Sequence, residues 1–148
     1  MIITFIGHSS LPTGHDLFEK IRSVLLEYIP KYDKTSFYCG GYGEFDALCA
    51  AVCREIKPLF PNSEIVIVTP YLNQEEKMRY CLAETLYDAV LYPPMENVPL
   101  KYAIPKRNEW MVSKADLILS YVTHSWGGAA KTLASAKKKK KAIIDLTT

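Results

Sequence analysis

The sequence lacks an apolar run of the roughly 18 residues that a membrane-spanning helix needs. Its N-terminus also lacks the basic flank and the cleavage site of a signal peptide. We therefore expect a cytoplasmic protein with no membrane partner. Of its 148 residues, 49% are hydrophobic and 23% are charged, which is typical of one globular domain over residues 1–148.

Two common nucleotide-binding motifs are absent. No G-x-G-x-x-G follows the first apolar stretch, and no G-x-x-x-x-G-K-[ST] loop occurs anywhere. These absences argue against an ordinary dinucleotide dehydrogenase and against an NTPase.

The four cysteines form no C-x-x-C pair, and no histidine lies near them in the sequence. Unpaired cysteine is among the most buried residue types. We predict structural thiols rather than a metal or redox site, and we expect no metal and no cofactor. The cysteines are Cys39, Cys49, Cys53 and Cys81.

Positive charge is scarce in the first two thirds of the chain. Residues 1–100 carry 8 basic and 13 acidic side chains, whereas residues 101–148 carry 10 basic and 3 acidic ones. The resulting balances are −5 and +7. Such a split can mark an anionic partner. However, half of the late basic residues form the run Lys137–Lys141, which is also typical of a solvated helix end.

What the sequence does contain is an alternation of strand and helix patterns. This alternation predicts an α/β fold, a Rossmann-like three-layer sandwich with a mainly parallel sheet and helices on both faces. The predicted strands are 2–7, 35–41, 63–71, 88–94, 115–122 and 142–146. The predicted helices are 16–29, 44–57, 74–86, 127–140 and one from near Pro105 to Lys114, after a loop over 93–105.

Glycine follows three of these strands, at Gly7, at Gly40–Gly41 and at Gly127–Gly128. Ligands of parallel sheets bind outside the carboxyl ends of the strands. Glycine allows close approach of a ligand, and a helix N-terminus favours an anion. We therefore predict a phosphate on the turn "SWGGAAKT", held by Ser125, Gly127, Gly128, Ala129 and Thr132. The alternative is a tight turn without a ligand.

Other polar residues belong to the same predicted edge of the sheet. His8 and His124 each follow a strand and could contact phosphate or ribose, or transfer protons. Asp46 could accept hydrogen bonds from ribose hydroxyls. The alternatives are ordinary surface histidines and a carboxylate that favours a helix N-terminus.

The segment "PKRNEWMV" at 105–112 adds three candidates. Arg107 can make a bidentate contact with phosphate, with Asn108 beside it. Trp110 offers a stacking face, although large aromatics more often belong to a core or an interface.

Three segments, in this order, resemble the SLOG superfamily. It is a Rossmann-like group that includes Lonely Guy phosphoribohydrolases and the nucleotide-binding core of DNA-processing protein A. The nearest resemblance is to its compact bacterial and phage branch. The matching segments are "GGYGEFDALCAA" (40–51), "PKRNEWMVSKADLILSYV" (105–122) and "GGAAKTLASAKKKKKAIIDL" (127–146).

The resemblance implies roles for individual residues. Arg107 matches the arginine that precedes the penultimate strand in Lonely Guy proteins. Gly127, Gly128 and Thr132 match their Gly-Gly turn, with one extra residue before the threonine.

The catalytic glutamate of those enzymes has no counterpart here. Its position falls on Ala134 or Ser135, and no carboxylate lies between Asp116 and Asp145. A general acid or base contributes roughly 10²–10⁴-fold to a rate. The remaining carboxylates that could replace it are Glu44, Asp46 and Glu109.

Three functions follow, in order of preference. The first is a module that binds a nucleotide or nucleotide-derived small molecule across the ends of strands 1, 2 and 5. The second is hydrolysis or transfer at the N-glycosidic bond of nucleoside monophosphates, with Arg107, Asp46 and Glu44 as weak catalytic candidates. The third is single-stranded DNA binding, by analogy with DNA-processing protein A and from the late basic excess.

The resemblance also implies a homodimer or a higher homo-oligomer. Tyr92, Tyr102, Trp110 and Met111 cluster around the proline-rich stretch 93–105. Aromatic residues and methionine are enriched at interfaces. The alternative is that these side chains fold back over the sheet as core.

Overall fold

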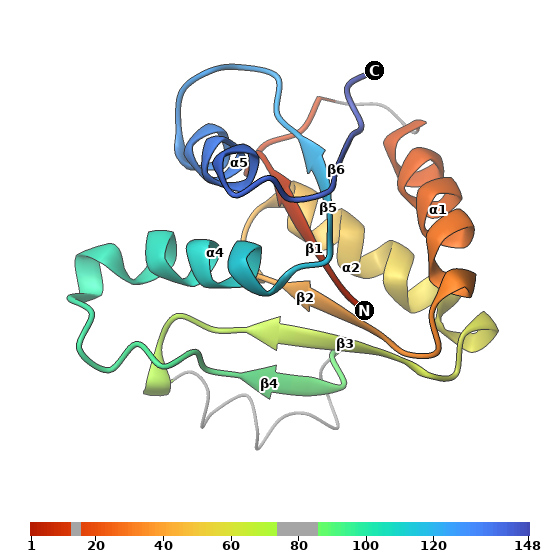
Figure 1. Ribbon diagram of the computed structural model, residues 1–148, viewed down its shortest axis with the longest axis horizontal. Helices are drawn as coiled ribbons and strands as arrows, with labels where there is room; N and C mark the ends of the chain where they lie inside the picture. The colour runs from red at the N-terminus through yellow and green to blue at the C-terminus, as the bar shows by residue number, and fades with distance from the viewer. Residues whose placement is uncertain (13–15, 74–85) are drawn as a thin grey trace.

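One parallel sheet runs through the computed structural model, which describes residues 1–12, 16–73 and 86–148 (Figure 1). Its six strands lie in the order β4-β3-β2-β1-β5-β6, and every neighbouring pair is parallel. The order reverses beside β1, so β1 and β5 flank the switch point at which such sheets bind ligands. The strands are β1 (Ile2–Gly7), β2 (Thr35–Cys39), β3 (Ser63–Val68), β4 (Ala89–Leu91), β5 (Leu117–Tyr121) and β6 (Ile143–Asp145).

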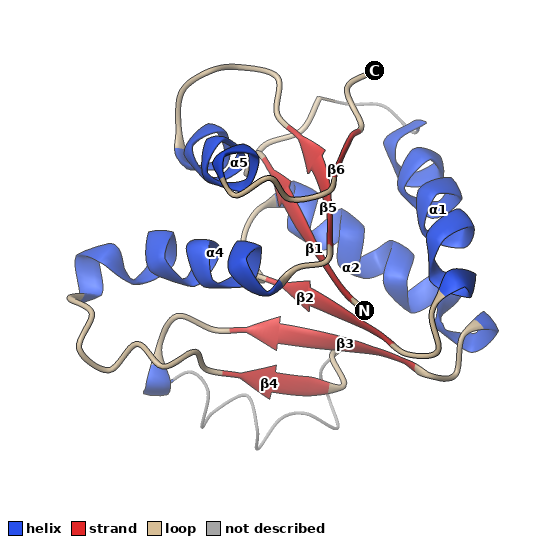
Figure 2. Ribbon diagram, viewed as in Figure 1, coloured by secondary structure: helices blue, strands red, loops and turns tan. Residues whose placement is uncertain are grey.

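Helices cover both faces of the sheet, as Figure 2 shows. On one face α1 packs against α2, and on the other α4 packs against α5. This arrangement confirms the predicted three-layer α/β fold. The helices are α1 (Asp16–Tyr28), α2 (Glu44–Ile56), α4 (Ala103–Lys114) and α5 (Gly128–Lys138).

Alternation along the central strands divides the core between the two faces. Ile3 and Phe5 of β1 join the cluster under α1 and α2, whereas Ile6 joins the cluster under α4 and α5. In β5, Leu117 and Leu119 face the first cluster and Ile118 faces the second. Successive side chains of a strand point to opposite faces, so burial on both sides requires the continuous apolar runs seen in the sequence.

Several predicted boundaries differ from the structure. The strand predicted over 35–41 ends at Cys39, because the glycines after it belong to the turn into α2. The helix predicted from Pro105 begins at Ala103, after a 3-10 turn at Leu100–Tyr102, so part of the predicted loop is helical. Pro105 then occupies the first turn, where its missing N–H has no partner to lose.

Most of the predicted helix 74–86 lies outside the described residues, as does Cys81. The other three cysteines are free and buried, as predicted. No helix in the described part of the chain is long and apolar enough to span a membrane.

Candidate functional site

A cavity of about 440 Å³ opens at the carboxyl ends of β1 and β5, between the starts of α2 and α5. Apolar side chains, including Phe5, Phe45 and Met111, form part of its wall. Most of the residues predicted as ligand contacts also line it. These are Gly7, His8, Asp46, Arg107, Asn108, His124, Gly127, Gly128, Ala129 and Thr132.

The start of α5 presents unpaired N–H groups to this cavity. Gly127 precedes the helix with φ 92° and ψ 178°, and no side chain caps it. The first main-chain bond runs from Lys131 N to Gly127 O, so the N–H groups of residues 128–130 have no acceptor among the described residues. A Cβ placed on Gly128 would meet no atom within 4 Å. An open, uncapped helix end of this kind attracts an anion.

Thr132 lines the same wall but has a different role from the one predicted. Its hydroxyl donates to the carbonyl of Gly128 at 2.9 Å, so its proton is already used within the helix. Thr132 can therefore accept a hydrogen bond from a ligand, but it can donate one to a phosphate only after the hydroxyl rotates.

Three aromatic rings form a column at the cavity wall. His8 stacks on His124 with ring centroids 3.9 Å apart, and His124 stacks on Trp126 at 3.8 Å. The interplanar angles are 20° and 18°. Trp126 ends the column and is 70% exposed.

Backbone hydrogen bonds fix both histidine rings. The N–H of Thr123 donates to His8 Nε2 at 2.8 Å, which requires that this nitrogen carry no proton. Burial and the charge of His124 lower the pKa of His8, which favours the same neutral form. His124 Nδ1 lies 2.9 Å from the carbonyl oxygen of Trp126. A carbonyl only accepts, so Nδ1 of His124 is assigned the proton in this bond.

Arg107 is used mainly to hold the sheet edge together. It is 2% exposed, and its Nη1 donates to the carbonyls of Gly40 and Val68, both at 2.8 Å. Its Nε donates to Oδ1 of Asn108 at 2.9 Å. The guanidinium thereby ties the ends of β2 and β3 to α4. Only Nη2 keeps free donors among the described contacts, so the predicted bidentate contact with phosphate is reduced to one nitrogen.

Asp46 is a partly buried carboxylate in the first turn of α2 and lines the cavity. Burial raises its pKa from 3.8 to about 6, against the lowering effects of the Tyr42 N–H and of the Arg107 charge. Its Oδ2 accepts the Tyr42 N–H at 3.3 Å. Asp46 therefore holds the glycine turn after β2 while it faces the cavity.

The other glycines are explained by packing within the chain. A Cβ on Gly7 would lie 2.2 Å from the Phe45 ring, and one on Gly40 would lie 2.8 Å from Asp46 Oδ2. A Cβ on Gly41 would lie 2.8 Å from Ile67 Cδ1. Gly40 and Gly41 do not line the cavity. Glycine at these strand ends admits side chains of the protein itself, whereas Gly128 faces open space.

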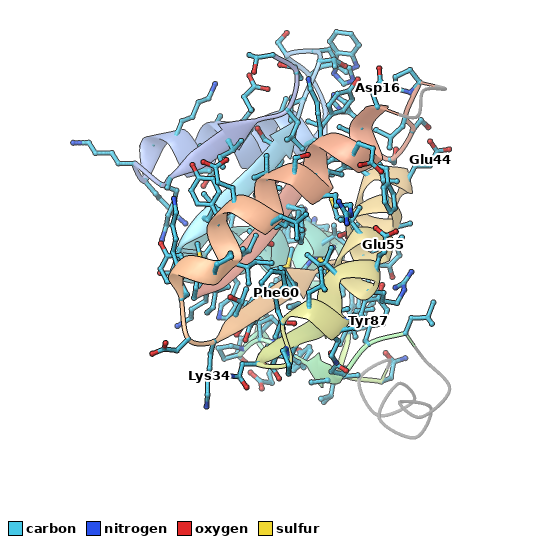
Figure 3. All side chains as sticks on the ribbon, turned by 90° about the vertical axis from the view of Figure 1, so that its right-hand side faces the viewer. Asp16, Lys34, Glu44, Glu55, Phe60 and Tyr87 are labelled. Atoms are coloured by element: carbon cyan, nitrogen blue, oxygen red, sulfur yellow. The ribbon has the colours of Figure 1, made fainter. Side chains whose placement is uncertain are left out.

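Ser125 and Glu44 also lie outside the cavity lining. Glu44 accepts a hydrogen bond from the N–H of Leu11 and sits on the exposed start of α2 (Figure 3). It supports the loop after β1 and is not placed to act on a ligand in this cavity. The lysines at 137–140 are exposed at the far end of α5, away from the helix start that lines the cavity.

Two residues that the sequence offered for stacking or assembly pack on the sheet. Trp110 stacks on Tyr38 with centroids 5.9 Å apart, and Met111 is 5% exposed in the core. Tyr102 remains exposed. The predicted interface cluster is therefore partly core.

Sequence analysis missed several residues that line the cavity. The most prominent is Trp126, and the others include Ser9, Ser10, Tyr42 and Ile104. Trp126 stands directly before the Gly-Gly pair in "SWGGAAKT", so an aromatic beside a predicted phosphate turn was the available signal. No group of three or more metal-binding side chains occurs within the described ranges.

Comparison with known proteins confirms the fold. The chain superposes on DNA processing protein A of Helicobacter pylori, which binds single-stranded DNA, with a TM-score of 0.66 and 14% identity. The match covers 98% of this chain and 64% of that one. DNA processing protein A of Streptococcus pneumoniae matches with a TM-score of 0.62 and 15% identity, over 97% of this chain and 49% of that one.

The chain thus spans less than two thirds of either structure. In sequence, it is 29% identical over 146 residues to the uncharacterized SPbeta prophage-derived protein YoqJ of Bacillus subtilis, a match covering 86% of this chain and 84% of the relative. No family model matches the sequence. At these identities the structural matches establish a Rossmann-like fold shared with DNA processing protein A.

Proposed function

We propose that this protein binds a nucleotide or a nucleotide-derived small molecule in the cavity between α2 and α5. The observation that carries the proposal is the open N-terminus of α5, whose first N–H groups face a cavity at the switch point of the sheet. The phosphate of the ligand binds there, because unpaired N–H groups and the helix dipole both favour negative charge.

The rest of the cavity suits the remainder of a nucleotide. Its volume of about 440 Å³ falls within the usual range of small-molecule sites. Asp46 at the start of α2 offers a carboxylate to ribose hydroxyls, and Arg107 Nη2 and the Asn108 amide add donors. The resemblance to the SLOG superfamily and the fold shared with DNA processing protein A support this assignment.

A change of charge at Gly128 tests the proposal with little change of shape. Gly128→Asp places a carboxylate in the anion site, whereas Gly128→Asn places a neutral group of the same size there. The fold should tolerate both, because the position is open and an acidic residue favours a helix N-terminus. We expect calorimetry to show that the wild type binds a nucleoside monophosphate, that Gly128→Asn binds it more weakly, and that Gly128→Asp does not bind it.

Equal affinities of the aspartate and asparagine variants would show that the phosphate does not bind at α5. A folded wild type that binds no mono-, di- or cyclic nucleotide would reject the function itself.

Single-stranded DNA binding is a second candidate. It is favoured by the fold shared with the Helicobacter pylori protein and by the exposed Trp126, because aromatic rings stack on unpaired bases. Binding to phosphates along a strand requires a steep decrease of affinity with salt. A fluorescent oligonucleotide titrated at two salt concentrations checks this, and absence of binding at low salt would exclude it.

Cleavage of an N-glycosidic bond remains a further candidate through Asp46, the carboxylate that lines the cavity in the described part of the chain. Release of free base from a nucleoside monophosphate, abolished by Asp46→Asn, would establish it. No release at high enzyme concentration would exclude it. Assembly as a homodimer is proposed from the resemblance, and light scattering at roughly 100 µM, well above the Kd of a standard interface, tests it.

A further inference from the structure

We propose that the outer face of the Trp126 indole is a stacking platform for the base of the bound nucleotide. This inference rests on the proposed function, since it assigns the base of a ligand whose phosphate binds at α5. It assigns to Trp126, which lines the cavity, the contact with the base.

The Trp126 side chain is exposed beside the cavity. Trp126 is 70% exposed and lines the cavity, whereas Trp110 packs on Tyr38. One face of the Trp126 ring is covered by His124 at 3.8 Å. No second ring contact is present for Trp126 among the described residues, so its other face is available to a flat ligand group.

Hydrogen bonds within the chain hold the platform in place. The column His8–His124–Trp126 is fixed by the bond from Thr123 N to His8 Nε2 and by the bond between His124 Nδ1 and Trp126 O. All of these partners except His8 lie on the loop between β5 and α5. A rigid aromatic surface loses little conformational freedom when a base stacks on it, so most of the stacking energy is available for binding.

The platform lies close in the chain to the proposed phosphate site. Trp126 and Gly128 are two residues apart, so their Cα atoms are separated by at most about 7.6 Å, twice the Cα spacing of a trans peptide. Gly127 between them adopts φ 92°, and a Cβ there would lie 3.9 Å from His124 Cε1. One ligand can therefore contact the helix start and the indole together if its base and phosphate are joined by a single sugar.

This arrangement predicts how the site discriminates. Stacking recognises the flat face that every base has, so bases should differ little in affinity. Removing the base from the ligand should lower its affinity much more than exchanging one base for another. The loss should be about 5- to 150-fold, which corresponds to the roughly 1–3 kcal/mol measured for base–aromatic stacking.

The experiment compares two ligands on three proteins. AMP and ribose 5-phosphate share the sugar and the phosphate and differ in the base. Calorimetry is carried out on the wild type, on Trp126→Leu and on Trp126→Phe, with thermal unfolding as the control for folding. We expect the wild type to bind AMP about 5- to 150-fold more tightly than ribose 5-phosphate. Trp126→Leu should abolish this preference and leave the affinity for ribose 5-phosphate unchanged, and Trp126→Phe should keep most of it.

The possible failures are distinguishable. If Trp126→Leu weakens both ligands equally, or neither, the platform is overturned while the phosphate site stands. If the folded wild type binds neither ligand, the proposed function fails and the platform with it.

A third ligand distinguishes a free nucleotide from a single strand of DNA as the source of the base. A short oligo-dA that binds no better than AMP indicates a free nucleotide, and one that binds far better with a steep salt dependence indicates a strand. Loss of the stronger binding in Trp126→Leu supports the platform in the second case. Retention of that stronger binding in Trp126→Leu overturns it.

Discussion

Two of the helices that line the cavity, α2 and α5, begin in the same way but have different surroundings. Gly43 precedes α2 with φ 88° and ψ 166°, and Gly127 precedes α5 with φ 92° and ψ 178°. Both conformations fall in a region that is essentially restricted to glycine. Neither helix has a side-chain cap on its first residue.

The difference is what occupies the space in front of each helix. At α2, a Cβ on Gly43 would lie 2.8 Å from the backbone of Ser9, and Ser9 O accepts the N–H of Glu44. Glu44 and Asp46 also bring negative charge into the first turn. At α5 the first turn carries no acidic residue, and the space before Gly128 is open.

This comparison shows that a glycine turn before a helix does not by itself identify an anion site. The chain pairs the first N–H of α2 with the Ser9 carbonyl and places two carboxylates in that turn, whereas the start of α5 has neither. The useful distinction is whether acidic residues occupy the first turn, because they supply the charge that the helix dipole favours.

The largest effect should come from substituting the two glycines that precede the helices. Gly43→Ala adds a backbone clash to the dihedral strain, so we expect it to lower the free energy of unfolding by about 3 kcal/mol or more. Gly127→Ala has only the strain, because its nearest atom is 3.9 Å away, and should cost about 1–3 kcal/mol. Urea unfolding at pH 7.5 measures both. Equal losses would contradict the claim that only the α2 turn is filled by the chain.

A smaller effect should appear in the pH dependence of Asp46→Asn. The raised pKa, about 6 rather than 3.8, means that the folded protein holds this proton more tightly than the unfolded chain does. The stability that Asp46 contributes is therefore greatest below about pH 4 and is lost as the pH rises through about 6.

Asparagine does not titrate, and its oxygen can still accept the Tyr42 N–H. The stability of the variant relative to the wild type should therefore increase by on the order of 1–3 kcal/mol between pH 4 and pH 7.5. The lowered pKa of His8 acts in the opposite direction but is common to both proteins and cancels. Parallel stability curves from urea unfolding across this range would show that Asp46 is not destabilised by its surroundings.

The smallest effect should come from Gly128→Ala. The position is helical and open, so alanine should raise the free energy of unfolding by about 0.4–1 kcal/mol, mainly by restricting the unfolded chain. Thermal unfolding checks the sign. A clear destabilisation would mean that the space in front of α5 is already occupied by the protein.

The sheet was predictable because its signal is local. Strands such as Ile2–Gly7 and Leu117–Tyr121 are continuous apolar runs, and the helices between them repeat apolar residues at helical spacing. Parallel pairing and right-handed crossovers then bring all carboxyl ends to one edge. The gathering of Gly7, Asp46 and Gly127 at one cavity follows from that topology.

The sequence did not reveal which of the site residues are engaged by the protein itself and which are open to the cavity. Arg107 looked like a phosphate ligand, yet its Nη1 donates to carbonyls at the ends of β2 and β3 and its Nε donates to Asn108, an arrangement set by packing between distant segments. Gly7 looked like a point of ligand approach, yet the Phe45 ring occupies that space. Trp126 was overlooked because its importance comes from two histidines, one of them 118 positions earlier in the chain.

The most direct test of ligand binding at the start of α5 follows the backbone amides of both helix starts in one experiment. A ¹⁵N–¹H correlation spectrum is recorded while a nucleoside monophosphate is titrated into the wild-type protein. We expect large chemical-shift changes for the amides of Gly128, Ala129 and Ala130, and small ones for Glu44 and Phe45 at the start of α2. Saturable shifts at α2 with an unchanged α5 would contradict this expectation.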